Sequence, residues 1–162
     1  MIDILVYLFE TYGYADACPE EPEQLTRKLS AVGFDEADIA EAVEWLKGLR
    51  LVASQAAPRP AAGTQSMRFF TEAETARLDV ESRGFLAFLE SAGVLDMRRR
   101  EMVIERAMAL PEAEIGLSQF KVMVLMVLWQ ERASVDALIL DELLTDEVAE
   151  IEDEWQEPVL MH

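Results

Sequence analysis

The longest apolar run in the chain is Val122–Trp129, which holds eight consecutive apolar residues. It lies inside a predicted helix at 118–131. The run is too short to cross a membrane, because a membrane-spanning helix needs roughly 18 or more apolar residues. A helix that is apolar on nearly every side must be covered on every side. We therefore expect 118–131 to be a central, buried helix, and we expect both halves of the chain to share the core around it.

Shorter amphipathic helices are expected on either side of this central helix, because apolar residues recur there at helical spacing. Several boundaries carry recognisable signals. Gly33 can end a helix in the left-handed conformation, Thr71 to Glu74 fits a capping box, and Asp79 and Asp96 can cap the helices that follow them. The remaining helices are predicted at 2–12, 23–33, 39–49, 79–91, 97–110 and 135–144, with a further short helix opening at Thr71.

Residues 25–70 follow the element order of a winged helix, with two helices and then two strand candidates, 51–53 and 67–70, around a loop rich in Pro and Ala. The predicted fold class is therefore mainly α, with an N-terminal winged-helix-like three-helix unit that includes a small β-hairpin, followed by a C-terminal helical bundle. The predicted divisions are a winged-helix-like subdomain at 1–72, a helical subdomain at 73–144, and an acidic tail at 145–162 that we expect to be flexible.

The predicted second helix of this unit, 39–49, is acidic, although a recognition helix would lie there in a DNA-binding winged helix. Its start and its outer face carry Asp35, Glu36, Asp38, Glu41 and Glu44 against a single Lys47. The phosphates that line a DNA groove repel such a face. The net charge of the chain is -18, which opposes non-specific binding to nucleic acid and favours basic protein partners.

The acidic tail is a second candidate for partner binding. Residues 133–162 contain ten Asp or Glu residues and no Lys or Arg, and the tail also holds Trp155 and the apolar residues 159–161. Apolar residues within an acidic flexible segment can dock onto a partner. A disordered, solubilising tail is the alternative interpretation.

The chain has one basic cluster, and three interpretations of it stay open. It consists of Arg98, Arg99, Arg100 and Arg106. Consecutive helical residues point about 100° apart, so the first three arginines cannot share one face. The cluster is either a solvated surface paired with acidic residues, a contact for phosphate or an acidic partner, or an internal clamp on the acidic tail. A nucleic-acid-binding regulator that uses Arg59, Arg68 and Arg98–Arg100 is the alternative to a protein-interaction role.

Catalytic and metal sites are not expected. His162 is the only histidine and Cys18 the only cysteine, so a zinc site made of His and Cys lacks ligands. Asp16 and Glu20 lie near Cys18 in the sequence, and neighbouring carboxylates disfavour a reactive thiolate. No Gly-rich phosphate-binding loop is present. We expect no cofactor, no metal and no enzymatic activity. The single cysteine and the lack of a signal peptide predict a cytoplasmic protein.

Much of the chain resembles the Smg family of bacterial proteins. The resemblance is carried by ILVYLFETY at 4–12, GFDEADIAEAVEWLKGL at 33–49, SMRFFTEAETARLD at 66–79, RGFLAFLE at 83–90, REMVIERAMAL at 100–110 and LSQFKVMVLMVL at 117–128. It implies a cytosolic protein of undefined function, whose gene often lies beside genes for DNA-processing proteins. It supplies no catalytic residues.

The sequence therefore favours a non-enzymatic protein-interaction or regulatory role. The candidate partner-binding residues are Glu36, Asp38, Glu41, Glu44 and Trp155. The expected partner is a basic or nucleic-acid-handling protein, and direct nucleic-acid binding is not expected. No membrane association is expected.

Overall fold

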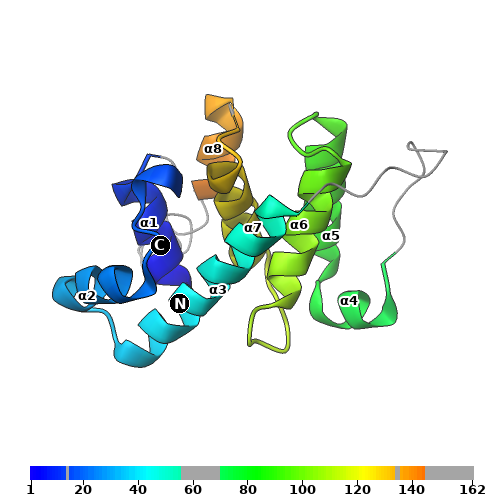
Figure 1. The fold of residues 1–162 in the computed structure, drawn as a ribbon. Coiled ribbons are helices and arrows are strands. Elements are labelled where there is room, and N and C mark those ends of the chain that lie inside the picture. The colour runs from blue at the N-terminus through cyan, green and yellow to red at the C-terminus, as the bar shows by residue number, and fades with distance from the viewer. Residues whose placement is uncertain (14, 56–69, 134–135, 145–162) are drawn as a thin grey trace, which may run out of the picture.

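The computed structural model describes residues 1–13, 15–55, 70–133 and 136–144, and within these ranges the protein is helical (Figure 1). The elements are α1 (Ile2–Thr11), a 3-10 turn η1 (Ala15–Ala17), α2 (Pro22–Val32), α3 (Glu36–Ser54), α4 (Glu72–Arg77), α5 (Val80–Ser91), α6 (Met97–Met108), α7 (Leu117–Gln130) and α8 (Ala137–Leu144). A single bridge of parallel β type joins Leu78 to Ile115. The prediction of a mainly α protein is confirmed.

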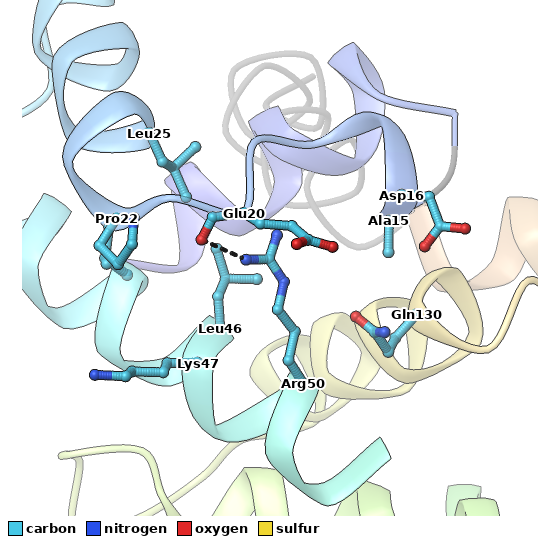
Figure 2. A pocket seen from close by; sticks show the side chains of 10 residues that line it. Ala15, Asp16, Glu20, Pro22, Leu25, Leu46, Lys47, Arg50 and Gln130 are labelled. Carbon is cyan, nitrogen blue, oxygen red and sulfur yellow. Dashed lines mark hydrogen bonds between the residues drawn. The ribbon is translucent and has the colours of Figure 1, made fainter. Parts of the chain in front are cut away.

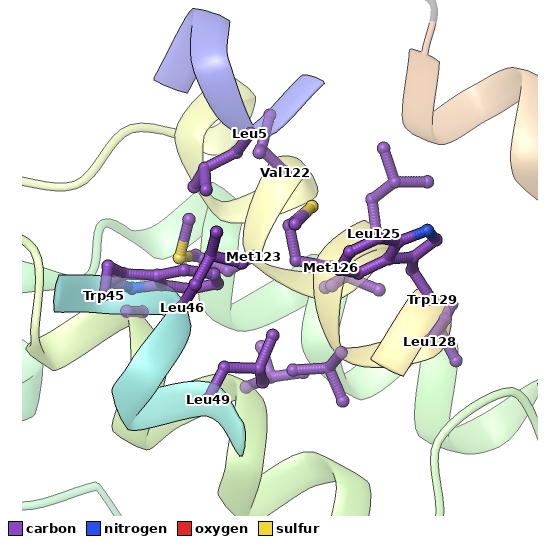
Figure 3. Packing of buried hydrophobic residues seen from close by; sticks show 14 of the residues in the cluster. Leu5, Trp45, Leu46, Leu49, Val122, Met123, Leu125, Met126, Leu128 and Trp129 are labelled. Atoms are coloured by element: carbon purple, nitrogen blue, oxygen red, sulfur yellow. The ribbon is translucent and has the colours of Figure 1, made fainter. Parts of the chain in front are cut away.

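The helix α7 lies at the centre of the molecule. Every residue from Phe120 to Trp129 is buried. Helices α1, α3, α5, α6 and α8 all pack against α7. Figure 3 shows Trp45, Leu46 and Leu49 of α3 facing Met123 and its neighbours across this core. The predicted central helix is confirmed, and the core that surrounds it contains residues from both halves of the chain.

The predicted β-hairpin is wrong. Its first strand, 51–53, belongs to α3, which continues without a break to Ser54. The apolar spacing explains this result, because Ala53 follows Leu46 and Leu49 at helical intervals and packs against the same core. Ser54 Oγ also donates a hydrogen bond to the carbonyl oxygen of Leu51 at 2.8 Å. Of the second strand candidate, 67–69 lies outside the described ranges.

The capping signals were predicted correctly at several boundaries. Gly33 ends α2 with a φ of 113°, in the left-handed region that favours glycine. Thr71 and Glu74 form a capping box at the start of α4. Asp79 and Asp96 accept hydrogen bonds from the backbone N–H of Ser82 at 2.7 Å and of Arg99 at 2.8 Å. Asp35 occupies the N-cap of α3, but its side chain makes no capping bond.

The proposed division at residue 72 stays a prediction. The acidic tail, 145–162, lies outside the described part of the chain, together with Trp155. The two arginines Arg59 and Arg68 of the alternative nucleic-acid surface are also outside it.

One arginine is hydrogen-bonded to the segment that connects α6 to α7. Arg77, the last residue of α4, donates from its guanidinium to the carbonyl oxygens of Met108, Leu110 and Glu112. Its own carbonyl oxygen accepts a hydrogen bond from the N–H of Ile115 at 2.7 Å. The last carbonyls of a helix have no partner within that helix. The guanidinium supplies a partner for the carbonyl of Met108 and for two carbonyls of the loop that follows, and so holds α4 against the end of α6.

Replacing Arg77 should therefore destabilise the whole protein. We expect Arg77→Ala to lower the free energy of unfolding by about 1–3 kcal/mol, since it leaves several carbonyls without donors. Arg77→Lys should recover only part of this loss, because an ammonium lacks the planar fork. Urea unfolding followed by circular dichroism measures both effects. A loss no larger than that of the control Arg27→Ala, at an exposed position of α2, would contradict this role.

Candidate partner-binding groove

The acidic residues of α3 lie on its outer face. Glu36, Asp38, Glu41 and Glu44 are all exposed. Asp38 Oδ1 lies 3.6 Å from the amino group of Met1. The inner face of the same helix is apolar and buried, and it consists of Ile39, Ala42, Trp45, Leu46 and Leu49. Burial of this stripe against the core fixes the rotation of α3 and so turns the acids to the surface.

Contacts between Trp45 of α3 and Arg106 of α6 hold the two helices together. Trp45 Nε1 donates to the carbonyl oxygen of Arg106 at 3.0 Å, and Arg106 Nη1 donates to the carbonyl oxygen of Trp45 at 2.8 Å. The guanidinium also lies over the indole ring, with its central carbon 5.5 Å from the ring centroid. Arg106 Nη2 donates to Glu105 Oε1 at 2.6 Å. These contacts give the buried charge of Arg106, which is only 6% exposed, partners on several sides.

Gly48 makes this arrangement possible. A Cβ atom at position 48 would stand 2.3 Å from Arg106 Nη1, so any larger residue would displace the guanidinium. Glycine in the middle of a helix ordinarily costs about 1 kcal/mol relative to alanine. Here it leaves the space that Arg106 occupies against Trp45.

An open groove of about 990 Å³ runs beside α3, over Trp45, Gly48 and Arg106. Glu41 and Glu44 lie at its edge. Toward the C-terminal end of α3 the lining includes apolar side chains, Leu51 of α3 and Ala109 and Pro111 after α6, beside the polar residues Lys47, Arg50 and Ser54. Leu51 is 61% exposed, so its side chain is available to a ligand. The groove therefore offers both carboxylates and apolar surface to a ligand.

The basic cluster of α6 makes contacts within the protein. Arg98 pairs with Glu131 and donates to the carbonyl oxygen of Ala53 at 2.8 Å, which ties the end of α3 to the end of α7. Arg100 pairs with Glu90 and Glu101 at 3.4 and 3.2 Å. Arg99 is half-buried. Arg106 is buried against α3, so the four arginines do not form one surface.

A second pocket of about 450 Å³ lies between α2, α3 and the loop that contains η1 (Figure 2). Arg50 reaches across it and donates to the carbonyl oxygens of Pro19 and Glu20, both at 3.1 Å. Cys18 belongs to this loop, and its side chain is buried. Burial raises the pKa of the Cys18 thiol above its ordinary value, and the positive charge and hydrogen bond of Arg50 partly oppose this shift. The thiol therefore keeps its proton at neutral pH.

Two further features concern the described ranges only. They contain no group of three or more His, Cys, Asp or Glu residues that could hold a metal ion. None of their helices is long and apolar enough to cross a membrane.

Together the fold and the groove describe a protein that is helical in the described part of the chain, with an acidic outer helix, α3, hydrogen-bonded to α6 and packed on the buried central helix. The chain belongs to the family described as "Protein of unknown function (DUF494)", whose match covers residues 1–152. The resemblance to the Smg family is thereby confirmed, because several relatives in this comparison carry the name "Protein Smg homolog".

These relatives match nearly the full length of the chain. The chain is 55% identical over 154 residues to the protein from Aromatoleum aromaticum, a match that covers 93% of this chain and 97% of that protein. It is 52% identical over 147 residues to the protein from Azoarcus sp., covering 91% and 94%. It is 48% identical over 147 residues to the protein from Bordetella pertussis, covering 91% and 96%. No solved structure matches the chain.

Sequence reasoning found the acids of the groove but missed its floor and its apolar end. Gly48 inside a predicted helix was an available signal, since such a glycine often marks a close approach of another group. Leu51 was assigned to a strand, which concealed its position two helical turns beyond Glu44.

The packing of Arg106 against Gly48 predicts an unusual double-mutant result. Gly48→Ala should not stabilise the protein, because the added methyl group displaces Arg106 and breaks its bond to Trp45. In an Arg106→Ala background the same change should stabilise by about 1 kcal/mol, the ordinary helix preference for alanine. Free energies of unfolding of the four proteins, measured in urea, test this. Equal effects of Gly48→Ala in both backgrounds would show that the two residues do not interact.

The position of Arg50 predicts the accessibility of Cys18. Arg50→Ala removes two hydrogen bonds to the loop, so the loop should open and expose Cys18 to a maleimide at pH 7 about tenfold more often. Labelling takes place from this open state, in which the thiol is no longer buried beside Arg50, so the loss of the Arg50 charge does not cancel the gain. In the unaltered protein, labelling should be slow, because the thiol is buried and protonated. Arg27→Ala, on the exposed face of α2, is the matched control and should label at the original rate. Unchanged labelling of the Arg50 variant would contradict this assignment.

Proposed function

We propose that this protein is a non-enzymatic interaction protein that binds a basic protein partner through the outer face of α3. The observation that carries this proposal is the groove beside α3, because it combines exposed carboxylates with an exposed leucine on one rigid helix. Charged residues are depleted at the centres of protein interfaces and apolar residues are enriched there. Leu51 would belong to the apolar part of such an interface, and Glu41 and Glu44 to its charged part.

The charge of the chain supports a basic partner. A net charge of -18 attracts cationic proteins over distances of several ångströms and accelerates their association. A nucleic-acid-handling protein is the class that fits this description, since such proteins carry basic surfaces. The same charge repels nucleic acid itself. We place this interaction in the cytoplasm, and the tail with Trp155 would add a further contact.

The experiment is an affinity pull-down from the native cytosol, analysed by mass spectrometry. We expect at least one partner that remains after nuclease treatment and that Glu41→Lys/Glu44→Lys reduces by about tenfold or more, since two charge pairs become repulsive. Binding of the captured partner should also weaken as the salt concentration rises, because salt screens the charges of the interface.

The matched control is Glu10→Lys/Glu81→Lys, which changes the net charge by the same amount at two exposed positions on α1 and α5. Its partners should equal those of the unaltered chain. If both double variants lose the same partners, only net charge matters and the groove is not the site. Capture that disappears with nuclease would instead favour nucleic-acid binding through Arg59, Arg68 and Arg98–Arg100.

A further inference from the structure

The groove changes its chemistry along α3. Its N-terminal half is acidic, with Glu41 and Glu44 at the edge. Its C-terminal half carries Lys47, the exposed Leu51 and Ser54. Arg50 also lines this half, but its guanidinium donates to the carbonyl oxygens of Pro19 and Glu20. Glu44 and Leu51 lie on one face of the helix, since seven residues are close to two full turns. The rise of an α-helix places them about 10 Å apart.

The backbone of α3 narrows the kind of ligand that fits. Its amide and carbonyl groups are already bonded inside the helix, so the groove presents side chains and no free strand edge. An extended peptide would leave its own backbone groups unpaired against the apolar end. A helix satisfies its backbone internally and presents side chains at matching intervals. A helical ligand therefore fits the groove best.

The order of charges selects one direction for that helix. Basic residues are favoured near the C-terminus of a helix, where they interact with the macrodipole. A helix with its basic residues in its C-terminal half, laid antiparallel to α3, would bring them over Glu41 and Glu44. Its N-terminal half would then cover Leu51 with apolar side chains and avoid a clash of positive charges with Lys47.

The floor of the groove is suited to such a ligand because it is rigid. Trp45 is held by its bond to the carbonyl oxygen of Arg106, and Arg106 is held by Trp45 and Glu105. A surface that is already ordered loses little conformational entropy on binding. A second copy of α3 is a poorer match, because its acids outnumber its basic residues.

We infer that the groove beside α3 binds an amphipathic helix of a partner protein, antiparallel to α3, with the helix's basic residues over Glu41 and Glu44 and an apolar residue on Leu51. This inference rests on the proposed function and adds the conformation, direction and pattern of the bound segment. It also assigns Leu51 a role in binding, which the charges of the groove alone do not predict.

The test is a peptide-display selection against the full-length protein, with random segments of about 16 residues, which as a helix would be about as long as α3. Enriched sequences should show apolar residues at helical spacing and Lys or Arg concentrated in the C-terminal half. Binding of the best peptide, measured by fluorescence anisotropy, should weaken about tenfold or more with Leu51→Asp, because burial of one leucine is lost.

Leu138→Asp is the matched control, since Leu138 of α8 is 79% exposed and lies outside the groove. It should leave binding unchanged. Circular dichroism and the thermal midpoint establish that each variant is folded. Sedimentation of the unaltered protein and of Leu51→Asp tests whether a second copy of the chain occupies the groove. A dimer of the unaltered protein that dissociates in Leu51→Asp would overturn the inference.

The selection separates this inference from the proposed function. Peptides that bind Leu51→Asp normally, or that lack helical spacing or the order of charges, would overturn the inference. If those peptides still lose binding with Glu41→Lys/Glu44→Lys, the proposed function stands. Peptides that bind both variants as tightly as they bind the unaltered protein would contradict both proposals. A selection that enriches no peptide would overturn the inference as well.

Discussion

The burial of α7 is the constraint on which the rest of the structure depends. All residues from Phe120 to Trp129 are buried, so five other helices must each give one apolar face to cover it. Even Lys121, which is 3% exposed, is accommodated by an ion pair with Glu142 at 3.3 Å and by the ring of Phe85. Each covering helix has only its other face left for solvent or for partners, and on α3 that face is acidic.

The link between α3 and α6 converts this arrangement into a rigid surface. Hydrophobic burial alone would allow α3 to slide or rotate slightly, because it is not directional. The reciprocal hydrogen bonds of Trp45 and Arg106 are directional, and they fix the two helices at one register. A buried guanidinium that lost its partners would destabilise the protein strongly. The same pair forms the floor of the groove, so stability and the candidate site depend on the same contacts.

Local patterns in the sequence predicted most of the helices, because caps and apolar spacing act over a few residues. Thr71, Asp79 and Asp96 were identified in this way. The strand predicted at 51–53 was wrong because packing of the whole helix outweighed the local sequence. Val52 has strand propensity, but the helical stripe that begins at Ile39 continues through Val52 and Ala53 into the core. The exposure of Glu41 and Glu44 also followed from helical periodicity.

The floor of the groove could not be predicted from the sequence. Gly48 and Arg106 are far apart in the chain, and only the packing of α3 on α6 brings them together. The pairing of Arg98 with Glu131 depends on packing in the same way. The sequence showed a basic cluster of four arginines, and its spacing left three interpretations open. Burial and partners of individual side chains, which are tertiary properties, separated Arg106 from the others.

The central claim is that the outer face of α3 is where this protein meets its partner. Site-specific photocrosslinking in the living cell tests it most directly, with a photoreactive amino acid in place of Glu44 or Leu51 in the full-length chain. The account predicts the same crosslinked protein from both positions, and no such product from the exposed positions Glu10 and Leu138, which lie outside the groove. A crosslinked protein that forms only at Glu10 or Leu138, or equally at all four positions, would contradict it.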